Sequence, residues 1–168
     1  LARNGDFPKV TYVTTGLVKD YGIKDPNNMG AAMAPAAVDT IYNHFKDTGR
    51  TPKDYDVIAT GDLGSVGKEI TTKLLLDYGY DVKDNYVDCG DLIFDDERQK
   101  TDAGGSGCGC SAVVTCGYFY KKLMKREIKS LLLVSTGALM STTSSLQGES
   151  IPGIAHAVAV FPWTRYFQ

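Results

Sequence analysis

Four runs of apolar or alternating residues predict the strands of a sheet. Val10–Thr14 alternates and is rich in β-branched residues, which is typical of a half-buried strand. Tyr55–Thr60, Ser130–Thr136 and Ile154–Phe161 contain more continuous apolar runs, and such runs favour strands that are covered on both faces. The stretch at Val87–Cys89 and the segment around Ile93 are short and remain ambiguous.

Between these strands, apolar residues recur at helical spacing. One helix is expected from Pro35 to Lys46, because proline is tolerated in a first turn. A second follows a glycine-rich turn, Gly61–Gly67, and a third runs from Cys110 to Lys122 after the dense glycine loop Gly104–Ser111. Strands and helices that alternate in this way predict an α/β class with a largely parallel or mixed sheet.

The remaining stretches predict loops. Tyr21–Gly30 is rich in Asp, Asn, Pro and Gly, and Gly137–Ser150 is rich in Ser and Thr. Asn4-Gly5-Asp6 has the composition of a tight turn, so Leu1 is interpreted as an internal start with the end of a strand before the turn. Residues 161–168 are interpreted as a tail or tag remnant.

Length and composition fit one globular domain. The 168 residues are 43% apolar and 23% charged, which excludes disorder and coiled coil as descriptions of the whole chain. The net charge of −2 gives no argument for nucleic acid or anionic lipid as a partner. Uncharged stretches run from Ala103 to Tyr120 and from Ser130 to Gly148, but neither is the continuous apolar run that a membrane helix needs.

Nucleophilic and metal chemistry find little support in the residue pattern. His44 is expected to be exposed on its helix and His156 to be a buried strand residue, and neither is placed beside a cysteine. The cysteines lack the C-x₂-C pairs of structural zinc. Cys108, Cys110 and Cys116 are therefore interpreted as reduced, small apolar residues where a helix packs.

The glycine-rich loops that lead into helices, here called helix entries, are better candidates for a binding site than the cysteines and histidines. GDLGSVGKE at 61–69 lacks the spacing of a phosphate-binding P-loop, but N–H groups at a helix start can still hold an anion. The loop at Ser106–Ser111 has the same property. Two such entries define a rim at the strand ends, where open α/β sheets bind ligands.

These motifs, taken in order, resemble the C-terminal half of the thiolase-like superfamily, and in particular a sporulation branch of it. The resemblance covers about residues 10–160, so residues 1–160 are expected to form a C-terminal thiolase-like half-domain, with 1–30 linking it to a missing N-terminal half. The segments that carry it are NNMGAAMAPAA, TGDLGSVG, DCG, GGSGCGCSA, STGALMS and QGESIPGIAHAV.

The chain departs from the condensing enzymes of that superfamily at their catalytic positions. The turn that carries a catalytic histidine there is matched by Gly61-Asp62-Leu63-Gly64, and the Gly-His-Pro loop by Gly107-Cys108-Gly109-Cys110. A further family asparagine is matched by Ser106 or its neighbours. The resemblance therefore implies a non-catalytic protein that retains the pocket.

The resemblance also implies a ligand and its partners. The expected ligand is dipicolinic acid (pyridine-2,6-dicarboxylic acid), with calcium considered as a companion ion and no other cofactor. Asp62 would repel a dicarboxylate, so it is expected to act through calcium, a water or a backbone-orienting bond. The expected ligand-binding residues are Gly61, Asp62, Gly64, Ser106, Gly107, Cys108, Cys110, Ser135 and Gly137.

The implied partners are membrane proteins of the same sporulation operon and the N-terminal half, with a homodimer left open and no nucleic acid. The implied role is uptake of the ligand into the forespore and its release in germination, at the periphery of the inner membrane. Two alternatives stay open: an acyltransferase or ketoacyl synthase-like enzyme acting on acyl-CoA or acyl carrier protein, and a structural docking subunit of a membrane channel.

Overall fold

A mixed five-stranded sheet forms the centre of the computed structural model, which describes residues 7–162 apart from the side chain of Asp96. The strand order is β1-β5-β4-β2-β3. The strands are β1 (Lys9–Thr14), β2 (Val57–Thr60), β3 (Tyr86–Asp88), β4 (Leu131–Ala138) and β5 (Gly153–Phe161). β2 pairs in parallel with β3 and β4, whereas β5 is antiparallel to β1 and β4. The α/β class with a mixed sheet is confirmed, although half of these four pairings are antiparallel.

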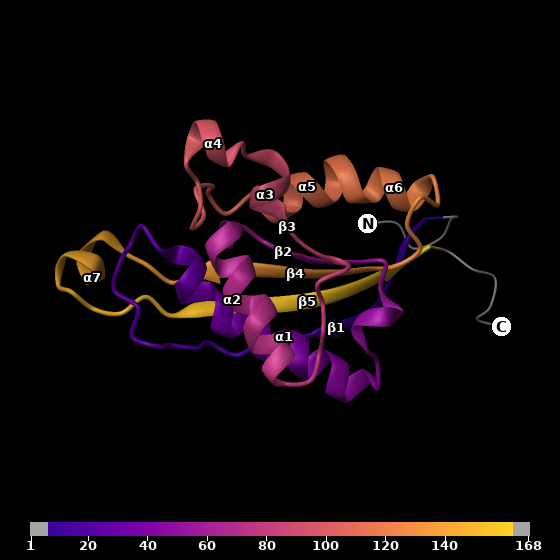
Figure 1. The fold of residues 1–168 in the computed structure, drawn as a ribbon, viewed down its shortest axis with the longest axis horizontal. Helices are drawn as coiled ribbons and strands as arrows, with labels where there is room; N and C mark the ends of the chain where they lie inside the picture. The colour runs from indigo at the N-terminus through magenta and orange to yellow at the C-terminus, as the bar shows by residue number, and fades with distance from the viewer. Residues whose placement is uncertain (1–6, 163–168) are drawn as a thin grey trace.

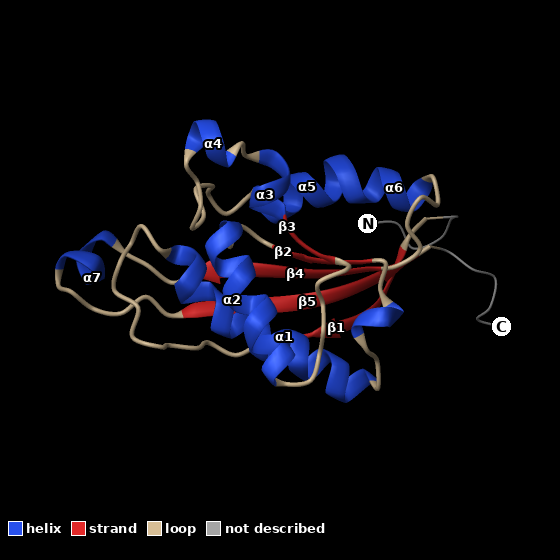
Figure 2. Cartoon of the chain, in the orientation of Figure 1, coloured by secondary structure: helices blue, strands red, loops and turns tan. Residues whose placement is uncertain are grey.

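Helices cover both faces of the sheet (Figures 1 and 2). The helices α1 (Met29–Thr48) and α2 (Gly64–Asp77) lie on one face. On the other lie α3 (Cys89–Ile93) and a helical run made of α5 (Cys110–Val114), the π-helical turn η2 (Thr115–Phe119) and α6 (Tyr120–Met124). The short elements η1 (Pro52–Asp54), α4 (Asp96–Gln99) and α7 (Thr142–Leu146) occupy the connections.

Successive side chains along each strand point to opposite faces of the sheet, so the core is divided between the two faces. Ile58 and Leu132 pack with Ile41 and Phe45 of α1, whereas Ala59 lies in a second cluster under the run from α5 to α6. This arrangement explains the continuous apolar runs in the sequence, because both faces of β2 and β4 are covered.

The first helix begins earlier than predicted. α1 starts at Met29, where the side chain of Asn28 accepts a hydrogen bond from Ala31 N at 3.2 Å, and Pro35 lies inside the helix. The prediction that Pro35 opens the helix is therefore wrong. The Asn28 cap supplies the start signal, and the end at Gly49 with φ of 66° is as expected.

Other boundaries differ more modestly. β4 continues to Ala138 and the third helix continues to Met124. The segment expected to be a loop after β4 contains α7, where Ser141 and Ser144 form reciprocal capping bonds. The ambiguous stretch at Val87–Cys89 resolves into the end of β3 and the start of α3.

The degree of exposure predicted for each histidine is wrong, although His156 does lie in a strand and is hydrogen-bonded. His44 is fully buried, with Thr14 Oγ1 2.8 Å from its Nδ1 and Tyr55 Oη 2.6 Å from its Nε2. His156 is exposed on β5, where its Nδ1 accepts a hydrogen bond from Gly16 N at 3.0 Å. Burial at position 44 comes from β1 and Tyr55 packing on α1, which the helix's own sequence does not encode.

The predicted turn at Asn4-Gly5-Asp6 and residues 163–168 of the predicted tail lie outside the described residues. Within residues 7–162, no helix combines the length and apolarity needed to cross a bilayer.

Candidate ligand site at the carboxyl edge of the sheet

The parallel strands β2, β3 and β4 end at the same edge of the sheet. The segments that follow them begin at Gly61, Cys89 and Leu139, so residues distant in sequence meet there. A crevice outside the carboxyl ends of parallel strands is the usual ligand position in open α/β sheets.

Asp88, the last residue of β3, holds this edge together. Its carboxylate accepts hydrogen bonds from Thr60 Oγ1 (2.7 Å), Leu63 N (3.0 Å), Gly64 N (3.1 Å) and Gly90 N (2.9 Å). The side chain thereby links the end of β2 to the starts of α2 and α3. Carboxylates are favourable near the amino end of a helix, where N–H groups lack partners.

The environment of Asp88 also shifts its titration. Burial raises the pKa of this carboxyl to about 6, against the lowering effect of its hydrogen bonds. Asp88 was not among the predicted site residues, although it stands in the DCG motif.

Asp62 fixes the glycine loop over the same edge. Its Oδ2 accepts hydrogen bonds from Gly105 N (2.9 Å) and Ser106 N (2.6 Å). A Cβ at Gly90 would collide with Asp62 Oδ1, so a side chain there would displace the Asp62 carboxylate. A backbone-orienting bond, one of the three roles expected for Asp62, is therefore present in the structure.

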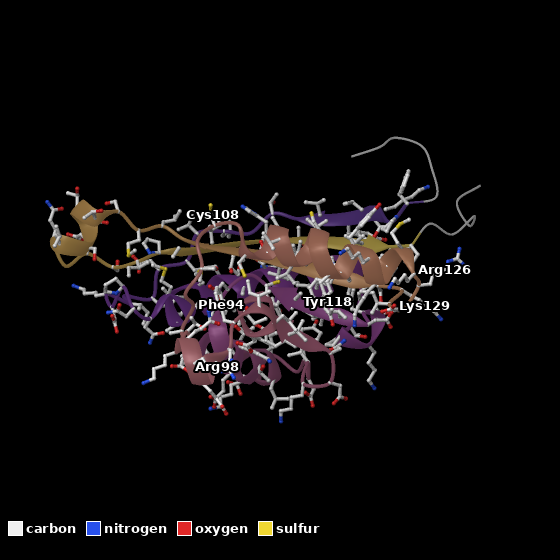
Figure 3. The ribbon with its side chains drawn as sticks, turned by 90° about the horizontal axis from the view of Figure 1, so that it is seen from above. Phe94, Arg98, Cys108, Tyr118, Arg126 and Lys129 are labelled. Atoms are coloured by element: carbon white, nitrogen blue, oxygen red, sulfur yellow. The ribbon has the colours of Figure 1, made fainter. Side chains whose placement is uncertain are left out.

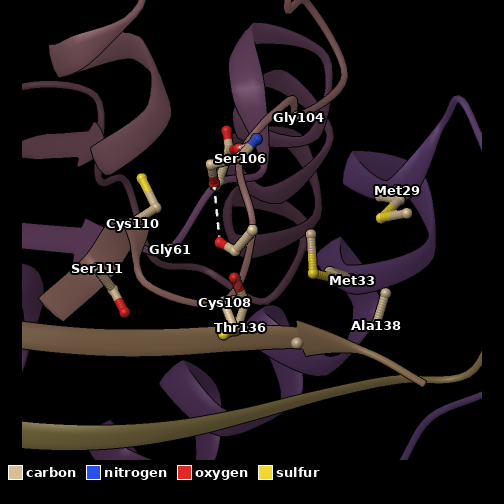
Figure 4. Close-up of a pocket in the computed structure, with 13 residues that line it drawn as sticks. Met29, Met33, Gly61, Gly104, Ser106, Cys108, Cys110, Ser111, Thr136 and Ala138 are labelled. Atoms are coloured by element: carbon tan, nitrogen blue, oxygen red, sulfur yellow. Dashed lines mark hydrogen bonds between the residues drawn. The ribbon is translucent and has the colours of Figure 1, made fainter. Parts of the chain in front are cut away.

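A cavity of about 280 Å³ lies between the glycine loop, α1 and the end of β4 (Figure 4). Glycines, serine and threonine residues, two cysteines and two methionines form most of its walls. The lining residues are Met29, Met33, Gly61, Asp62, Gly104, Ser106, Gly107, Cys108, Cys110, Ser111, Thr136, Gly137 and Ala138.

Two strand ends approach closely at the floor of this cavity. A Cβ at Gly61 would collide with Thr136 Oγ1, so the glycine allows the two strands to approach this closely. The Thr136 hydroxyl is buried and has no hydrogen-bond partner in the described protein. An unpartnered buried hydroxyl on a cavity wall is available to a ligand.

The structure places seven of the nine predicted residues on this cavity. Gly64 and Ser135 do not line it. Gly64 starts α2 with φ of 62° and donates its N–H to Asp88, whereas Ser135 lies within β4 opposite His156. The lining residues that sequence reasoning missed are Met29, Met33, Gly104, Ser111, Thr136 and Ala138.

The cysteines divide into two environments. Cys89 and Cys110 are buried, and burial raises the pKa of both thiols. Cys108 and Cys116 are exposed, so the interpretation of every clustered cysteine as a packed apolar residue holds only for Cys110.

Neither histidine lines the cavity. His44 is buried in the hydrogen-bond network of Thr14 and Tyr55, and burial lowers its pKa to about 4. His156 bonds to Gly16 on the antiparallel side of the sheet. Within residues 7–162, no group of three or more His, Cys, Asp or Glu side chains is arranged to hold a metal ion.

Comparison with known sequences identifies the family. The sequence model described as stage V sporulation protein AD matches residues 1–161. The chain belongs to this family. Its stage V sporulation protein AD relative from Bacillus subtilis (strain 168) is 51% identical over 150 residues, which are 89% of this chain but 44% of that protein. The chain therefore spans less than half the length of its relative.

Solved structures support the thiolase-like fold of this family member. A 3-oxoacyl-(acyl-carrier-protein) synthase III matches with a TM-score of 0.51 and 12% identity, over 94% of this chain and 51% of the synthase. AbyA1, a tetronic acid condensing enzyme, matches with a TM-score of 0.51 and 11% identity, over 96% of this chain and 49% of the enzyme. At such identities the likeness concerns the fold alone.

Proposed function

We propose that the cavity at the carboxyl edge of the sheet binds dipicolinic acid, and that the protein carries this ligand for uptake into the developing spore and for release in germination. Membership of a sporulation family supports the biological setting. The cavity is the single observation that carries the proposal.

The lining suits a small, planar, polar ligand. Glycines at 61, 104, 107 and 137 leave backbone exposed to the cavity, and Ser106, Ser111 and Thr136 supply hydroxyls. The helical run that starts at Cys110 also begins at this cavity, so its amino end favours a carboxylate.

Asp62 limits how a dianion can be held. Its carboxylate lines the cavity and repels another carboxylate, and the described residues alone do not form a metal site. We therefore assign calcium, as companion cargo, to the ligand's own oxygens, with Asp62 keeping the glycine loop in place.

The complete protein is proposed to close this site with the part of its length that this chain does not include. The outward side of the run from α5 to α6 exposes Ala112, Val113, Cys116 and Tyr120. An exposed apolar surface of this kind is normally a contact surface for another protein part. Membrane proteins of the same operon, at the inner membrane of the spore, are the proposed recipients of the ligand.

Titration calorimetry of the complete protein with dipicolinate, with and without calcium, tests the binding function. We expect saturable binding and no turnover of acyl-CoA with a malonyl donor, because no histidine lines the cavity. Turnover that is lost on substitution of Cys108 would instead establish an acyltransferase. Absence of both binding and turnover would favour a structural docking subunit.

A further inference from the structure

Positive charge is concentrated in one short segment of the chain. Residues 121–129 hold five of the 18 basic residues and one of the 20 acidic residues. The segment therefore carries a charge of +4 while the rest of the chain carries −6. We define the basic patch as Lys121, Lys122, Lys125, Arg126 and Lys129.

The fold displays this patch at one end of the molecule. α6 ends at Met124, and Arg126 reverses the chain with φ of 59° before β4 begins. Figure 3 shows Arg126 and Lys129 together at that end, well away from the cavity residue Cys108. All members except the half-buried Lys122 are exposed.

Local partners do not account for this charge. Within the described residues, Lys125 reaches Glu127 at 3.8 Å and Lys122 lies 4.6 Å from the centre of the Tyr118 ring, and no ion pair involves Lys121, Arg126 or Lys129. The nearby Asp56 accepts hydrogen bonds from the backbone N–H groups of Lys129 and Ser130.

The helix dipole does not account for it either. The carboxyl end of a helix is equivalent to about half a negative charge, which one cation satisfies. Five cations in nine residues exceed that need several-fold. The excess charge points to a partner of opposite sign.

We propose that the basic patch docks the protein on a bilayer surface that contains anionic phospholipid. Clusters of four to eight Lys or Arg residues bind such surfaces, and each cation contributes about 1 kcal/mol. Met124, with 43% of its surface exposed, lies within the patch and offers an apolar side chain to the headgroup region. This inference builds on the peripheral location proposed above and names the surface responsible, but it does not depend on dipicolinate binding.

The experiment is co-sedimentation of the complete protein with vesicles of phosphatidylcholine alone or with phosphatidylglycerol added. The patch variant is Lys121→Gln, Lys125→Gln and Lys129→Gln. The control variant is Lys24→Gln, Lys46→Gln and Lys83→Gln, which removes the same charge from exposed lysines elsewhere. Thermal melts and dipicolinate calorimetry on each protein separate docking from folding and from ligand binding.

We expect the parent to bind the anionic vesicles, to bind more weakly as salt rises, and to leave neutral vesicles unbound. The patch variant should lose about a hundredfold in vesicle partitioning, at about fivefold per cation, while the control binds as the parent does. Equal losses in both variants, or a folded patch variant that still binds like the parent, would overturn the proposal. A parent that ignores anionic vesicles but binds an acidic protein or a nucleic acid would also overturn it.

Discussion

His44 shows how one buried side chain couples the fold to pH. Burial lowers the pKa of its imidazole to about 4, while an unfolded chain has a histidine pKa of about 6.5. As pH falls through this window, the unfolded state takes up the proton first, so the stabilisation that is present above pH 6.5 is lost towards pH 4.

We therefore predict that lowering the pH from 7.5 to 4.5 reduces the free energy of unfolding of the parent by about 2.5 kcal/mol more than that of His44→Gln. Urea unfolding at the two pH values measures this difference, whatever the variant loses in absolute stability. Equal losses in parent and variant would mean that His44 is not the responsible group.

Asp62 carries a second prediction, because its carboxylate accepts two N–H groups of the glycine loop. Asp62→Asn should destabilise the protein by about 1–3 kcal/mol, since it weakens these bonds in a buried position. Amide hydrogen exchange at Gly105 and Ser106 should accelerate as well. Asp84→Asn, at an exposed turn, is the matched control and should change stability by less than about 0.5 kcal/mol. Unchanged exchange at both amides in Asp62→Asn would show that the loop does not depend on this side chain.

Among the elements, α1 and α2 cross with almost no space between their backbones. A Cβ on Gly67 would lie 2.8 Å from Gly30 Cα, and a Cβ on Gly30 would collide with the Leu63 carbonyl. This contact places Met29 and Met33 beside the glycine loop.

Gly67→Ala should therefore destabilise the protein by about 1–3 kcal/mol through overpacking, despite the better helix propensity of alanine. Lys73→Ala, at an exposed position of the same helix, should change stability by less than about 0.5 kcal/mol. Thermal or urea unfolding compares the two. A Gly67→Ala protein as stable as the parent would indicate that the helices can move apart freely.

Elements with a strong local signal could be predicted from the sequence, and those that depend on tertiary contacts could not. The β-branched and apolar runs located β2, β4 and β5, and the dense glycines before Cys110 correctly predicted a loop that feeds a helix. The start of α1 is not evident from the sequence, because Pro35 also suits a first helical turn, and Met29 and Met33 of the cavity wall lie before it. The burial of His44 and the exposure of His156 depend on which strand packs beside each residue, which local periodicity does not reveal.

For the whole molecule, the outward side of the run from α5 to α6 provides a test of the proposed closure. Cys116 is exposed on that side and Cys108 at the cavity, whereas Cys89 and Cys110 are buried with raised pKa values. In the complete protein we expect Cys116 to be protected by the covering part. Cys108 should react faster, because a small reagent can enter the cavity by the route that the ligand uses. Mass spectrometry after timed alkylation measures each site. Rapid labelling of Cys116 would show that this side stays uncovered.

Dipicolinate should protect Cys108 in the same experiment, because that residue lines the proposed binding cavity. This protection needs no substitution and leaves the fold unchanged. Labelling of Cys108 that is indifferent to saturating ligand would place the ligand elsewhere.

The most direct measurement compares dipicolinate affinity in two glycine variants of one loop. Gly107 lines the cavity and Gly109 does not, and a Cβ at either position meets no protein atom within 4 Å. Gly107→Val should fold and lose at least tenfold in affinity, or about 1.4 kcal/mol, because its side chain takes space that the ligand needs. Gly109→Val should bind as the parent does, and a folded Gly107→Val protein with the parent's affinity would contradict the assignment of this cavity as the ligand site.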